Sequence, residues 1–316
     1  MKILITGGCG FVGRHLSKRL SQDSSNRITI VDNLSTGLKL ENWPRHLMMK
    51  PEHIVYGDCL EFFNTSNDKF DVIFHLAAIV EGRLVIENDP FKVANDLIID
   101  TSMFRWAVRT KPAKIVYFSS SAVYPVKLQT EENNIALSED LVSVRDEKID
   151  VPDLSYGWAK LNGEFLSNLG VSKHGLDIAV YRPFSGYGED QAMSYPTPAL
   201  IKRILTENEI EVWGSGNQSR DFIYIEDCIT GILKTYERIS DGSALNLGTG
   251  VRTSFKDFIR EGCAILGKDF KIKPLLDKPE GVFARYCDAT LQHKYGFFPE
   301  CSLREGISLI MDYWKK

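Results

Sequence analysis

Three serines and one tyrosine–lysine pair are the side chains of this sequence best suited to chemistry. Ser119, Ser120 and Ser121 follow the apolar run "KIVYF", and Tyr156 and Lys160 stand four residues apart in "SYGWAK". Residues four apart share one face of a helix, so the lysine ammonium is predicted beside the tyrosine ring. An adjacent ammonium favours the phenolate, which could take a proton from a hydroxyl as hydride leaves the same carbon.

A glycine-rich turn precedes these residues in "ILITGGCGFVG". Gly7, Gly10 and Gly13 lie between an apolar run and an amphipathic stretch. Glycine permits a tight turn and lets the backbone approach a pyrophosphate at a helix N-terminus. Asp32 ends the next apolar run and suits the two free ribose hydroxyls of NAD, so NAD is favoured over NADP. Asp58 in "VYGDC" either meets the adenine edge or is a plain turn residue.

The elements that must position these side chains alternate along the chain. Five β-branched runs are continuously apolar, which predicts strands buried on both faces of a parallel sheet covered by helices. The fold class expected is therefore α/β, a Rossmann-type doubly wound sheet. The expected strands are "KILIT" at 2–6, "RITIVD" at 27–32, "DVIFHLAA" at 71–78, "KIVYFSS" at 114–120 and "DIAVYRP" at 177–183.

After Arg182 the alternation of strand-like and helix-like stretches is replaced by loops rich in Gly, Pro and aromatic residues. Such loops often carry binding residues, so we expect a cofactor-binding domain over 1–181 and a smaller C-terminal substrate-binding domain over 182–316. The run "ALNLGT" at 244–249 predicts that the chain returns to the first domain at about 220–250. The polar stretch 127–153 is expected to be a partly ordered surface loop, either a lid or a solvated insertion.

Composition excludes several classes of function. The chain has 316 residues and a formal charge of −4, which gives no basic footprint for nucleic acid or an anionic membrane. Its longest apolar stretch is too short for a membrane span, and its start lacks the pattern of a signal peptide, so a cytoplasmic protein is expected. The six cysteines form no Cys-x-x-Cys pair, and neither a metal site nor a disulfide framework is predicted.

Taken together, these motifs resemble the extended short-chain dehydrogenase/reductases, specifically the NAD-dependent nucleotide-sugar epimerases and dehydratases. The resemblance rests on the glycine turn, "VDNLSTG", "FHLAA", "SSSAVY", "SYGWAK", "SRDFIYIEDC" and "NLGTG", in family order over nearly the whole chain. It implies a Rossmann domain that holds NAD, a C-terminal domain that binds a nucleoside-diphosphate sugar, and transient oxidation of a sugar carbon, usually C4. It also implies a homodimer formed through two helices, here near 95–110 and 156–170.

The resemblance also implies roles for individual residues. Tyr156 would be the base, Lys160 would bind the nicotinamide ribose, and Ser120 would hydrogen-bond the reacting hydroxyl. Substrate would be bound by Ser120, Ser121, Ser185, Arg220 and Arg285, of which the two arginines would form an anion clamp on the diphosphate. Cofactor contacts would come from Gly7, Gly10, Phe11, Val12, Gly13, Asp32, Asn33, Ser35, Thr36, Gly37, Asp58, Cys59, Leu76, Ala77, Ala78, Asn95, Ser119, Tyr156, Lys160 and Arg182.

The two positions after Ser120 separate the family's reactions. Dehydratases carry an Asp-Glu pair there, decarboxylases a glutamate at the second position, and 3,5-epimerases a cysteine, whereas this chain has Ser121 and Ala122. The sequence therefore favours a 4-epimerase, in which Tyr156 deprotonates the 4-hydroxyl, the keto sugar rotates, and hydride returns to its other face.

Other readings stay open. A C4 dehydrogenase/reductase needs the same groups, and a GDP-mannose 3,5-epimerase-like enzyme could take an acid from the 127–153 loop or from "GYGEDQ". A non-catalytic NAD-binding regulator would be expected to lack the tyrosine or the lysine. Ser185 replaces an asparagine usual in the family, and another asparagine is displaced, with Asn95 nearby and Leu97 at the aligned position. UDP is favoured by family frequency, and GDP competes with it.

Overall fold

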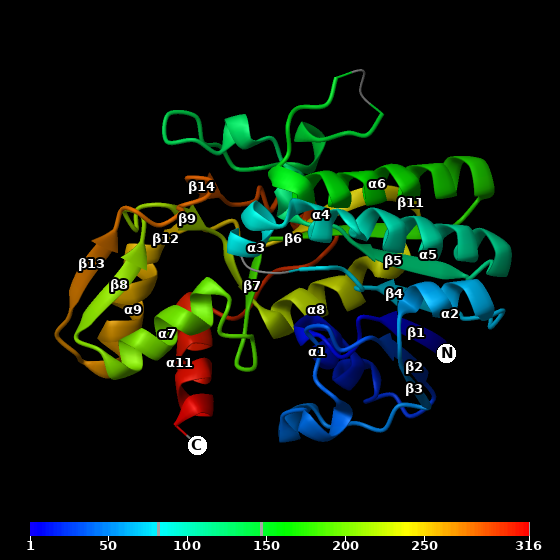
Figure 1. Ribbon diagram of the computed structural model, residues 1–316, viewed down its shortest axis with the longest axis horizontal. Helices are drawn as coiled ribbons and strands as arrows, with labels where there is room; N and C mark the ends of the chain where they lie inside the picture. Colours follow the sequence, from blue (N-terminus) through cyan, green and yellow to red (C-terminus); the bar gives the residue numbers. More distant parts are fainter. Residues whose placement is uncertain (81–82, 146–147, 316) are drawn as a thin grey trace.

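A seven-stranded parallel sheet forms the larger part of the computed structural model, which describes residues 1–80, 83–145 and 148–315 (Figure 1). The strand order is β11-β6-β5-β4-β1-β2-β3, so the chain starts in the middle and winds outward in both directions. The strands are β1 (Lys2–Thr6), β2 (Arg27–Asp32), β3 (His53–Tyr56), β4 (Val72–His75), β5 (Lys114–Phe118), β6 (Ile178–Pro183) and β11 (Asp241–Leu247). This is the doubly wound α/β fold expected from the sequence.

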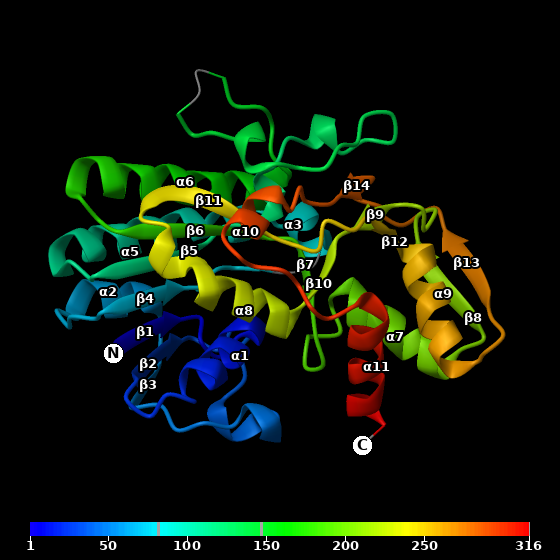
Figure 2. The same cartoon turned by 180° about the vertical axis from the view of Figure 1, so that it is seen from behind.

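Alternating side chains of the strands fill two separate cores. Ile3 and Ile5 pack on one face with α1 (Phe11–Leu20) and α8 (Ile225–Thr235), whereas Leu4 packs on the other. That second face is covered by α2 (Cys59–Thr65), α5 (Asp96–Thr110) and α6 (Leu154–His174). Figures 1 and 2 show the two helix layers on opposite sides of the sheet. Burial on both faces explains why the strands read as continuous apolar runs.

All five expected strands are present, and two of them end earlier than expected. β4 ends at His75 and β5 at Phe118, which leaves "LAA" and the three serines in the loops beyond the sheet. The strand expected at 244–249 is also present, because β11 pairs in parallel with β6 at the sheet edge. The carboxyl ends of these strands carry the sequence motifs, and ligands of such sheets bind along that edge.

A smaller group of elements lies beside one end of the sheet (Figure 1). It contains three small sheets: β8 paired with β13, β9 between β12 and β14, and β7 paired with β10. Its strands are β7 (Ser185–Tyr187), β8 (Glu209–Trp213), β9 (Ser219–Arg220), β10 (Phe222–Tyr224), β12 (Thr253–Ser254), β13 (Lys271–Leu275) and β14 (Ala284–Arg285). Its helices are α7 (Pro196–Thr206), α9 (Phe255–Leu266) and α11 (Leu303–Trp314); the remaining short helices are α3 (Arg83–Asn88), α4 (Pro90–Ala94) and α10 (Thr290–Lys294).

The polar stretch 127–153 lies on the surface and is attached to the C-terminal region. The main-chain oxygen of Gln129 accepts hydrogen bonds from Phe283 and Ala284, and Leu137 bridges to Cys287 in parallel. Two positions of the stretch, 146 and 147, lie outside the described residues. The described part is therefore a surface loop tied to the segment around β14.

Two absences hold for the described ranges 1–80, 83–145 and 148–315. No helix there has both the length and the apolar character needed to cross a membrane. No group of three His, Cys, Asp or Glu side chains there could hold a metal ion. All six cysteines have free thiols.

Candidate active site

The serine turn lies directly after β5. The Ser120 side chain begins a short 3-10 turn, Ser121–Val123, by accepting a 3.1 Å hydrogen bond from the Ala122 main-chain N–H. Ser121 and Ala122 are both buried. The same turn packs against the start of α6, because a Cβ on Gly157 would lie 2.5 Å from the Ala122 carbonyl oxygen. Glycine at 157 thus lets the helix that carries Tyr156 approach the serine turn closely.

Tyr156, Lys160 and Ser120 meet at this contact. The Tyr156 hydroxyl shares a hydrogen bond with the Ser120 side chain. The Lys160 nitrogen lies 5.9 Å from the centre of the Tyr156 ring and 5.4 Å from that of Tyr117, and Lys160 is buried. The three residues taken from the sequence as a catalytic group are therefore neighbours in space.

Burial and charge act on Tyr156 in opposite directions. Burial raises the pKa of Tyr156 above its ordinary value, while the Lys160 ammonium and the Ser120 hydrogen bond lower it without cancelling the rise. Burial lowers the pKa of Lys160, but Tyr156, Asp100 and Asp96 outweigh it, so that pKa is raised and the ammonium persists. The protein alone therefore keeps Tyr156 protonated near neutral pH.

Two buried acids behind Lys160 were missed by sequence reasoning. Asp96 and Asp100 are both completely buried on α5. They lie on the same buried face of α5 as Met103 and Ala107, at positions where an apolar residue is expected. The sequence signal that could have revealed these two acids is a charged residue at the helical spacing of the buried apolar residues.

The glycine turn has the geometry of a cofactor cradle. Gly7 has a φ of +71°, and a Cβ there would lie 2.7 Å from the Ala77 main-chain nitrogen. A Cβ on Gly13 would collide with the Gly7 carbonyl oxygen, so α1 packs as closely on the turn as the sequence predicts. Gly10 precedes α1, and Phe11 and Val12 are its first residues. The N-terminus of α1, which begins directly after Gly10, suits a pyrophosphate.

Asp32 is held rigidly at the end of β2. One carboxylate oxygen accepts from the Cys9 N–H at 2.9 Å and the other from the Leu34 N–H at 2.7 Å. Burial raises the pKa of Asp32, and these N–H bonds and Arg14 oppose the rise. Each oxygen keeps a further acceptor position, which fits the two hydroxyls of a ribose. The turn and Asp32 together fit NAD.

The other proposed cofactor residues divide into two groups. Asn33, Ser35, Thr36 and Gly37 form the turn after Asp32, and Leu76, Ala77 and Ala78 follow β4 at the same sheet edge. Asp58 caps α2 by accepting from the Leu60 N–H, which supports the turn reading, and Cys59 is buried behind it. Asn95 and Leu97 are exposed, whereas Asp96 between them is completely buried.

Arg182, predicted as a cofactor contact, has another set of partners. Its guanidinium forms a two-pronged ion pair with Glu164, at 2.9 and 2.7 Å, and also donates to Tyr124 and to the carbonyl oxygens of Glu139 and Val142. These five bonds use all of its N–H donors. Ser119 donates to the same Glu164 carboxylate at 2.5 Å. Arg182 and Ser119 thus support the site from behind, and Arg182 has no donor left for a cofactor.

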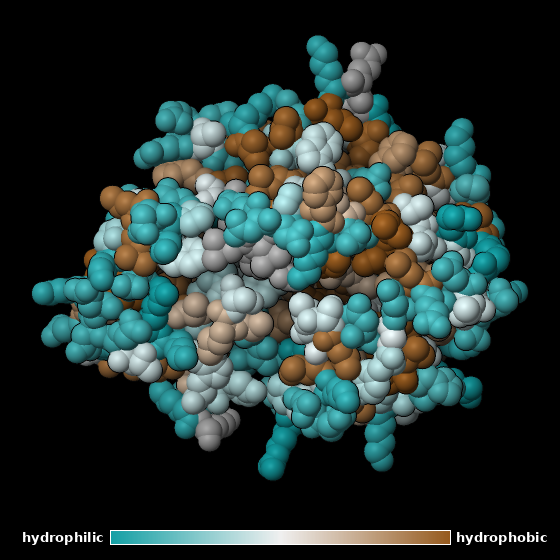
Figure 3. Space-filling model, viewed as in Figure 1, coloured by the Kyte–Doolittle hydropathy of each residue, from teal (hydrophilic) through white to brown (hydrophobic). Residues whose placement is uncertain are grey.

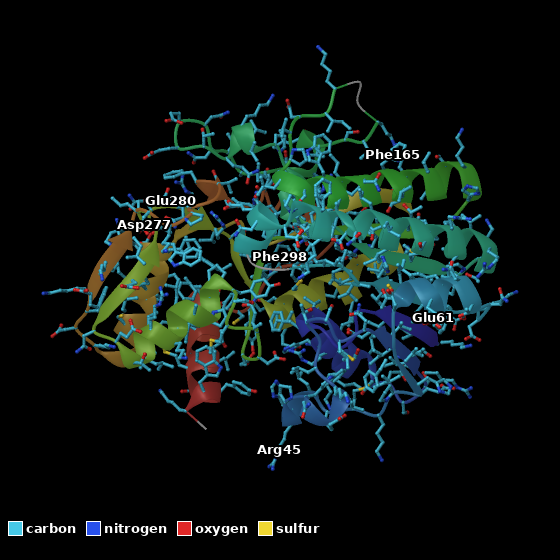
Figure 4. All side chains as sticks on the ribbon, viewed as in Figure 1. Arg45, Glu61, Phe165, Asp277, Glu280 and Phe298 are labelled. Atoms are coloured by element: carbon cyan, nitrogen blue, oxygen red, sulfur yellow. The ribbon has the colours of Figure 1, made fainter. Side chains whose placement is uncertain are left out.

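The two arginines predicted as an anion clamp are direct neighbours. Arg220 on β9 and Arg285 on β14 are paired in register in a parallel ladder, although 65 positions (285 − 220) separate them in sequence. Arg285 donates to Asp153 at 2.7 Å, and Asp153 is the residue before α6. Arg220 donates to main-chain oxygens, including that of Glu280, which Figure 4 labels in this segment. Ser185 is partly buried at the start of β7.

The acids of "GYGEDQ" are bound to the cofactor side of the molecule. The Asp190 side chain is buried and accepts from Arg14 at 2.6 Å and from His15 at 2.8 Å, and His15 also contacts Glu226 of α8 at 2.7 Å. Glu189 accepts from the Tyr224 hydroxyl. These contacts hold the segment against α1 rather than over Tyr156.

This buried histidine predicts a pH dependence of folding. Burial lowers the pKa of His15, but hydrogen bonds to Asp190 and Glu226 outweigh it and raise the pKa to about 9, against 6.5 unfolded. Its stabilising contribution is therefore complete below pH 6.5 and is lost as the pH rises through about 9. Between pH 6 and 9.5 we expect the wild-type protein to lose at most about 3 kcal/mol of unfolding free energy from this source. His15→Gln should show no such loss.

Urea unfolding of both proteins at the two pH values measures this loss. If the unfolding free energy decreased equally in the wild-type protein and in His15→Gln, His15 would not be the source of the loss. Lys315→Gln, which alters an exposed cation in a surface pair, serves as the matched control and should follow the wild-type protein.

Comparison with known proteins agrees with this geometry. A model of the NAD dependent epimerase/dehydratase family matches residues 3–248. An uncharacterised UDP-glucose epimerase of Bacillus subtilis is 31% identical over 265 residues, 80% of this chain and 78% of the relative. GDP-mannose 3,5-epimerase of Arabidopsis thaliana is 27% identical, and the alignment covers all of this chain and 82% of the relative.

Among solved structures, UDP-glucuronic acid 4-epimerase from Bacillus cereus, in complex with UDP-glucuronic acid and NAD, is similar throughout. It is 27% identical with a TM-score of 0.84, and the superposition covers 100% of this chain and 99% of that one. The similarity spans both the sheet and the smaller group of elements.

Proposed function

Because the chain belongs to the NAD dependent epimerase/dehydratase family, we propose that it is a nucleotide-sugar 4-epimerase acting by transient oxidation at C4. As a member it is an NAD-dependent enzyme of nucleotide sugars. The proposal concerns the reaction and the carbon at which it occurs.

One observation carries the proposal. The Tyr156 hydroxyl is hydrogen-bonded to Ser120 with the Lys160 ammonium behind it, and the next two residues, Ser121 and Ala122, offer no acid or base. Dehydration, decarboxylation and 3,5-epimerisation each need such a further group to act on a leaving hydroxyl, a carboxylate or a C–H proton. Proton transfer at one hydroxyl needs only Tyr156.

Three of the acids in these segments are bound to other partners. Asp190 and Glu189 are held by Arg14, His15 and Tyr224, as described above. In the 127–153 loop, Glu139 accepts from the Asn246 N–H. These contacts argue against Asp190, Glu189 and Glu139 as the additional acid of a 3,5-epimerase.

The chain's residues divide the work of the reaction. When bound, NAD supplies a reversible hydride acceptor at the sugar carbon. Ser120 orients the reacting hydroxyl, Tyr156 takes its proton and later returns it, and Lys160 stabilises the phenolate in between. Asp32 and the glycine turn hold the adenosine and pyrophosphate ends. No second substrate is required, because proton and hydride both return to the sugar.

The paired arginines support a diphosphate as the substrate's recognition group. Arg220 and Arg285 lie on adjacent strands, and their forked guanidinium groups would suit a diphosphate if Arg285 exchanged its Asp153 partner for the phosphate. Ser121 and Ser185 would contact the sugar side. UDP is preferred over GDP because two of the similar proteins reported above are named for UDP-sugars, and one for GDP-mannose.

A substrate panel tests the proposal. Purified protein is incubated with UDP-glucose, UDP-glucuronic acid and GDP-mannose, and products are identified by NMR. Inversion at C4 without net NADH is the expected result. Solvent deuterium at C3 or C5 would indicate the 3,5-epimerase alternative, and accumulation of NADH would indicate a C4 dehydrogenase. No change in any sugar would contradict the proposal.

Three further assignments belong to it. We assign residues 1–181, with the return near 220–250, to NAD binding and residues 182–316 to the nucleotide sugar, in a cytoplasmic enzyme. We also propose a homodimer, because Ile98 on α5 and Trp158 and Phe165 on α6 are exposed. Apolar surface is visible over these helices in Figure 3, and Figure 4 labels Phe165 on α6. Analytical ultracentrifugation measures the mass.

A further inference from the structure

We propose that Asp153 is a positioning residue displaced by the substrate: its carboxylate competes with the diphosphate for Arg285 and, once displaced, caps α6, the helix that carries the proposed base. The inference deepens the proposed function and rests on it, because it takes Arg285 as a ligand of the diphosphate. It couples binding of the diphosphate to the start of the catalytic helix.

The ion pair between Arg285 and Asp153 is close and largely shielded from water. The guanidinium donates to one Asp153 carboxylate oxygen at 2.7 Å, and its Nε donates to the Gln129 side chain at 2.6 Å. The side-chain exposure is 12% for Arg285 and 10% for Asp153, against 59% and 57% in the surface pair of Arg260 with Asp257. Low exposure limits the screening of the attraction, so this pair holds Arg285 more firmly than a surface pair would.

A diphosphate and the Asp153 carboxylate are alternative partners of the same guanidinium. Both are anions that accept hydrogen bonds from forked N–H donors, and two anions that share one cation repel each other. Arg220 is paired in register with Arg285 on the adjacent strand, so a diphosphate bound by both arginines lies beside the position of the carboxylate. Such a diphosphate therefore displaces Asp153 from Arg285.

Main-chain hydrogen bonds connect Asp153 to both parts of the proposed catalytic group. Its N–H donates to the Ala122 carbonyl oxygen in the serine turn at 2.9 Å, and its own carbonyl oxygen accepts from the Gly157 N–H at 2.9 Å. Asp153 is the N-cap residue of α6, and in Figures 1 and 2 β14 lies near the start of that helix. One residue thus contacts Arg285, the serine turn and the first turn of α6.

The carboxylate of Asp153 is of the type that caps helices, yet within the described residues it makes no capping hydrogen bond to α6. An N-cap Asp ordinarily accepts from the second or third N–H of its helix, which here belong to Ser155 and Tyr156. Leu154, the first residue of α6, has a φ of +54°, a left-handed conformation that is costly for a residue with a Cβ. The start of α6 is therefore held away from the regular capped form while Asp153 binds Arg285.

Release from Arg285 gives the Asp153 carboxylate an alternative partner close by. The first N–H groups of α6 have no acceptor inside the helix, and a negative charge is favoured at a helix N-terminus. Capping of α6 then offsets part of the cost of separating the ion pair. The diphosphate thus replaces one partner of Asp153 with another and orders the turn that carries Tyr156.

Nucleotide binding to the NAD-saturated protein tests the competition. Dissociation constants for UDP and GDP are measured by isothermal titration calorimetry in the wild-type protein, in Asp153→Asn and in Asp153→Ser. If the form with an open pair is about a tenth of the free protein or less, both variants should bind the diphosphate at least about tenfold more tightly. Uridine and guanosine lack phosphates, and their affinities should not change.

A double-mutant cycle and a charge control identify the route of the effect. In an Arg285→Gln background, Asp153→Asn should no longer tighten binding, because the shared partner is absent. Asp150→Asn removes a negative charge from the same segment, where Asp150 pairs with Lys127 and is half exposed, and it should leave the dissociation constants unchanged. Tightening that persists in the Arg285→Gln background would overturn the proposal, as would an equal gain in Asp150→Asn. Unchanged or weaker diphosphate binding in the folded Asp153 variants would do the same.

Hydrogen–deuterium exchange tests the transfer of Asp153 to α6. Binding of UDP or GDP to the wild-type protein should slow exchange of the Ser155 and Tyr156 amides, because a cap protects them from water. Asp153→Ala can bind the nucleotide but cannot cap, so these amides should gain less protection. Asp153→Ser should protect them before any nucleotide is added. Equal gains of protection in the wild-type protein and in Asp153→Ala would refute the capping step.

The outcome is separate from that of the substrate panel. Tighter diphosphate binding without C4 inversion of any sugar would keep the role of Asp153 and refute the 4-epimerase assignment. C4 inversion with unchanged affinities in the Asp153 variants would do the reverse. If neither UDP nor GDP bound to any of these proteins, Arg285 would not be a diphosphate ligand and the inference would be wrong.

Discussion

Tyr156→Phe should lower kcat for C4 inversion by about 10²–10⁴-fold, the range that general acid–base groups contribute. Phenylalanine keeps the ring that packs beside Lys160 and removes only the hydroxyl that bonds Ser120. Since that hydroxyl is proposed to take and return the substrate proton, proton transfer has no substitute within the motif. The measurement is initial velocity by NMR with the sugar identified in the substrate panel.

Binding of substrate and of NAD should be retained in Tyr156→Phe. The diphosphate arginines and the glycine turn are untouched, so KM and the content of bound NAD should stay near their wild-type values. Tyr56→Phe is a suitable control, because Tyr56 is exposed on β3 and its hydroxyl only accepts from the Leu40 N–H. An undiminished kcat in Tyr156→Phe would rule out Tyr156 as the base.

Local motifs allowed the spatial grouping of the proposed catalytic residues to be predicted from sequence. Tyr156 and Lys160 lie within one helix turn of each other, and Gly7 to Gly13 form a single βα junction, so short-range spacing already determines their geometry. The continuous apolar runs likewise predicted the parallel sheet and even its late strand β11. For these features the sequence neighbours are also the spatial neighbours.

The residues that were predicted less well are those whose positions depend on tertiary contacts. Arg220 and Arg285 were expected to act together, but only the pairing of β9 with β14 makes them neighbours. Asn95 and Asp96 are adjacent in sequence, and the phase of α5 exposes one and buries the other. A shift of one residue on a helix turns a side chain by about 100°, which motif matching cannot resolve.

Arg182 illustrates the same limit at a strand end. The family resemblance implied a cofactor contact for Arg182, and the structure instead surrounds the guanidinium with Glu164 and two carbonyl oxygens. The partners come from α6 and from the 127–153 insertion, whose arrangement the sequence did not predict. Arg182 therefore connects the insertion, the helix of Tyr156 and the strand beside Ser119.

Arg182→Met should lower the free energy of unfolding by about 3–5 kcal/mol, the cost of breaking a buried ion pair by removing one partner. The Glu164 carboxylate, itself buried, would lose its counter-charge, and the Glu139 and Val142 carbonyl oxygens would lose a donor. Chemical denaturation monitored by circular dichroism measures the change. Arg260→Met is the matched control: it removes an arginine from an exposed pair with Asp257 and should cost no more than about 1 kcal/mol.

Two further measurements distinguish a structural role of Arg182 from a role in cofactor binding. Adding Glu164→Gln to Arg182→Met should recover part of the lost stability, since the uncompensated charge is then removed. The dissociation constant for NAD, measured where the variant is still folded, should be unchanged if the five N–H donors serve only the protein. A weakened affinity for NAD with little loss of stability would instead return Arg182 to the cofactor site, because a structural ion pair between α6 and β6 could not be removed without lowering the unfolding free energy.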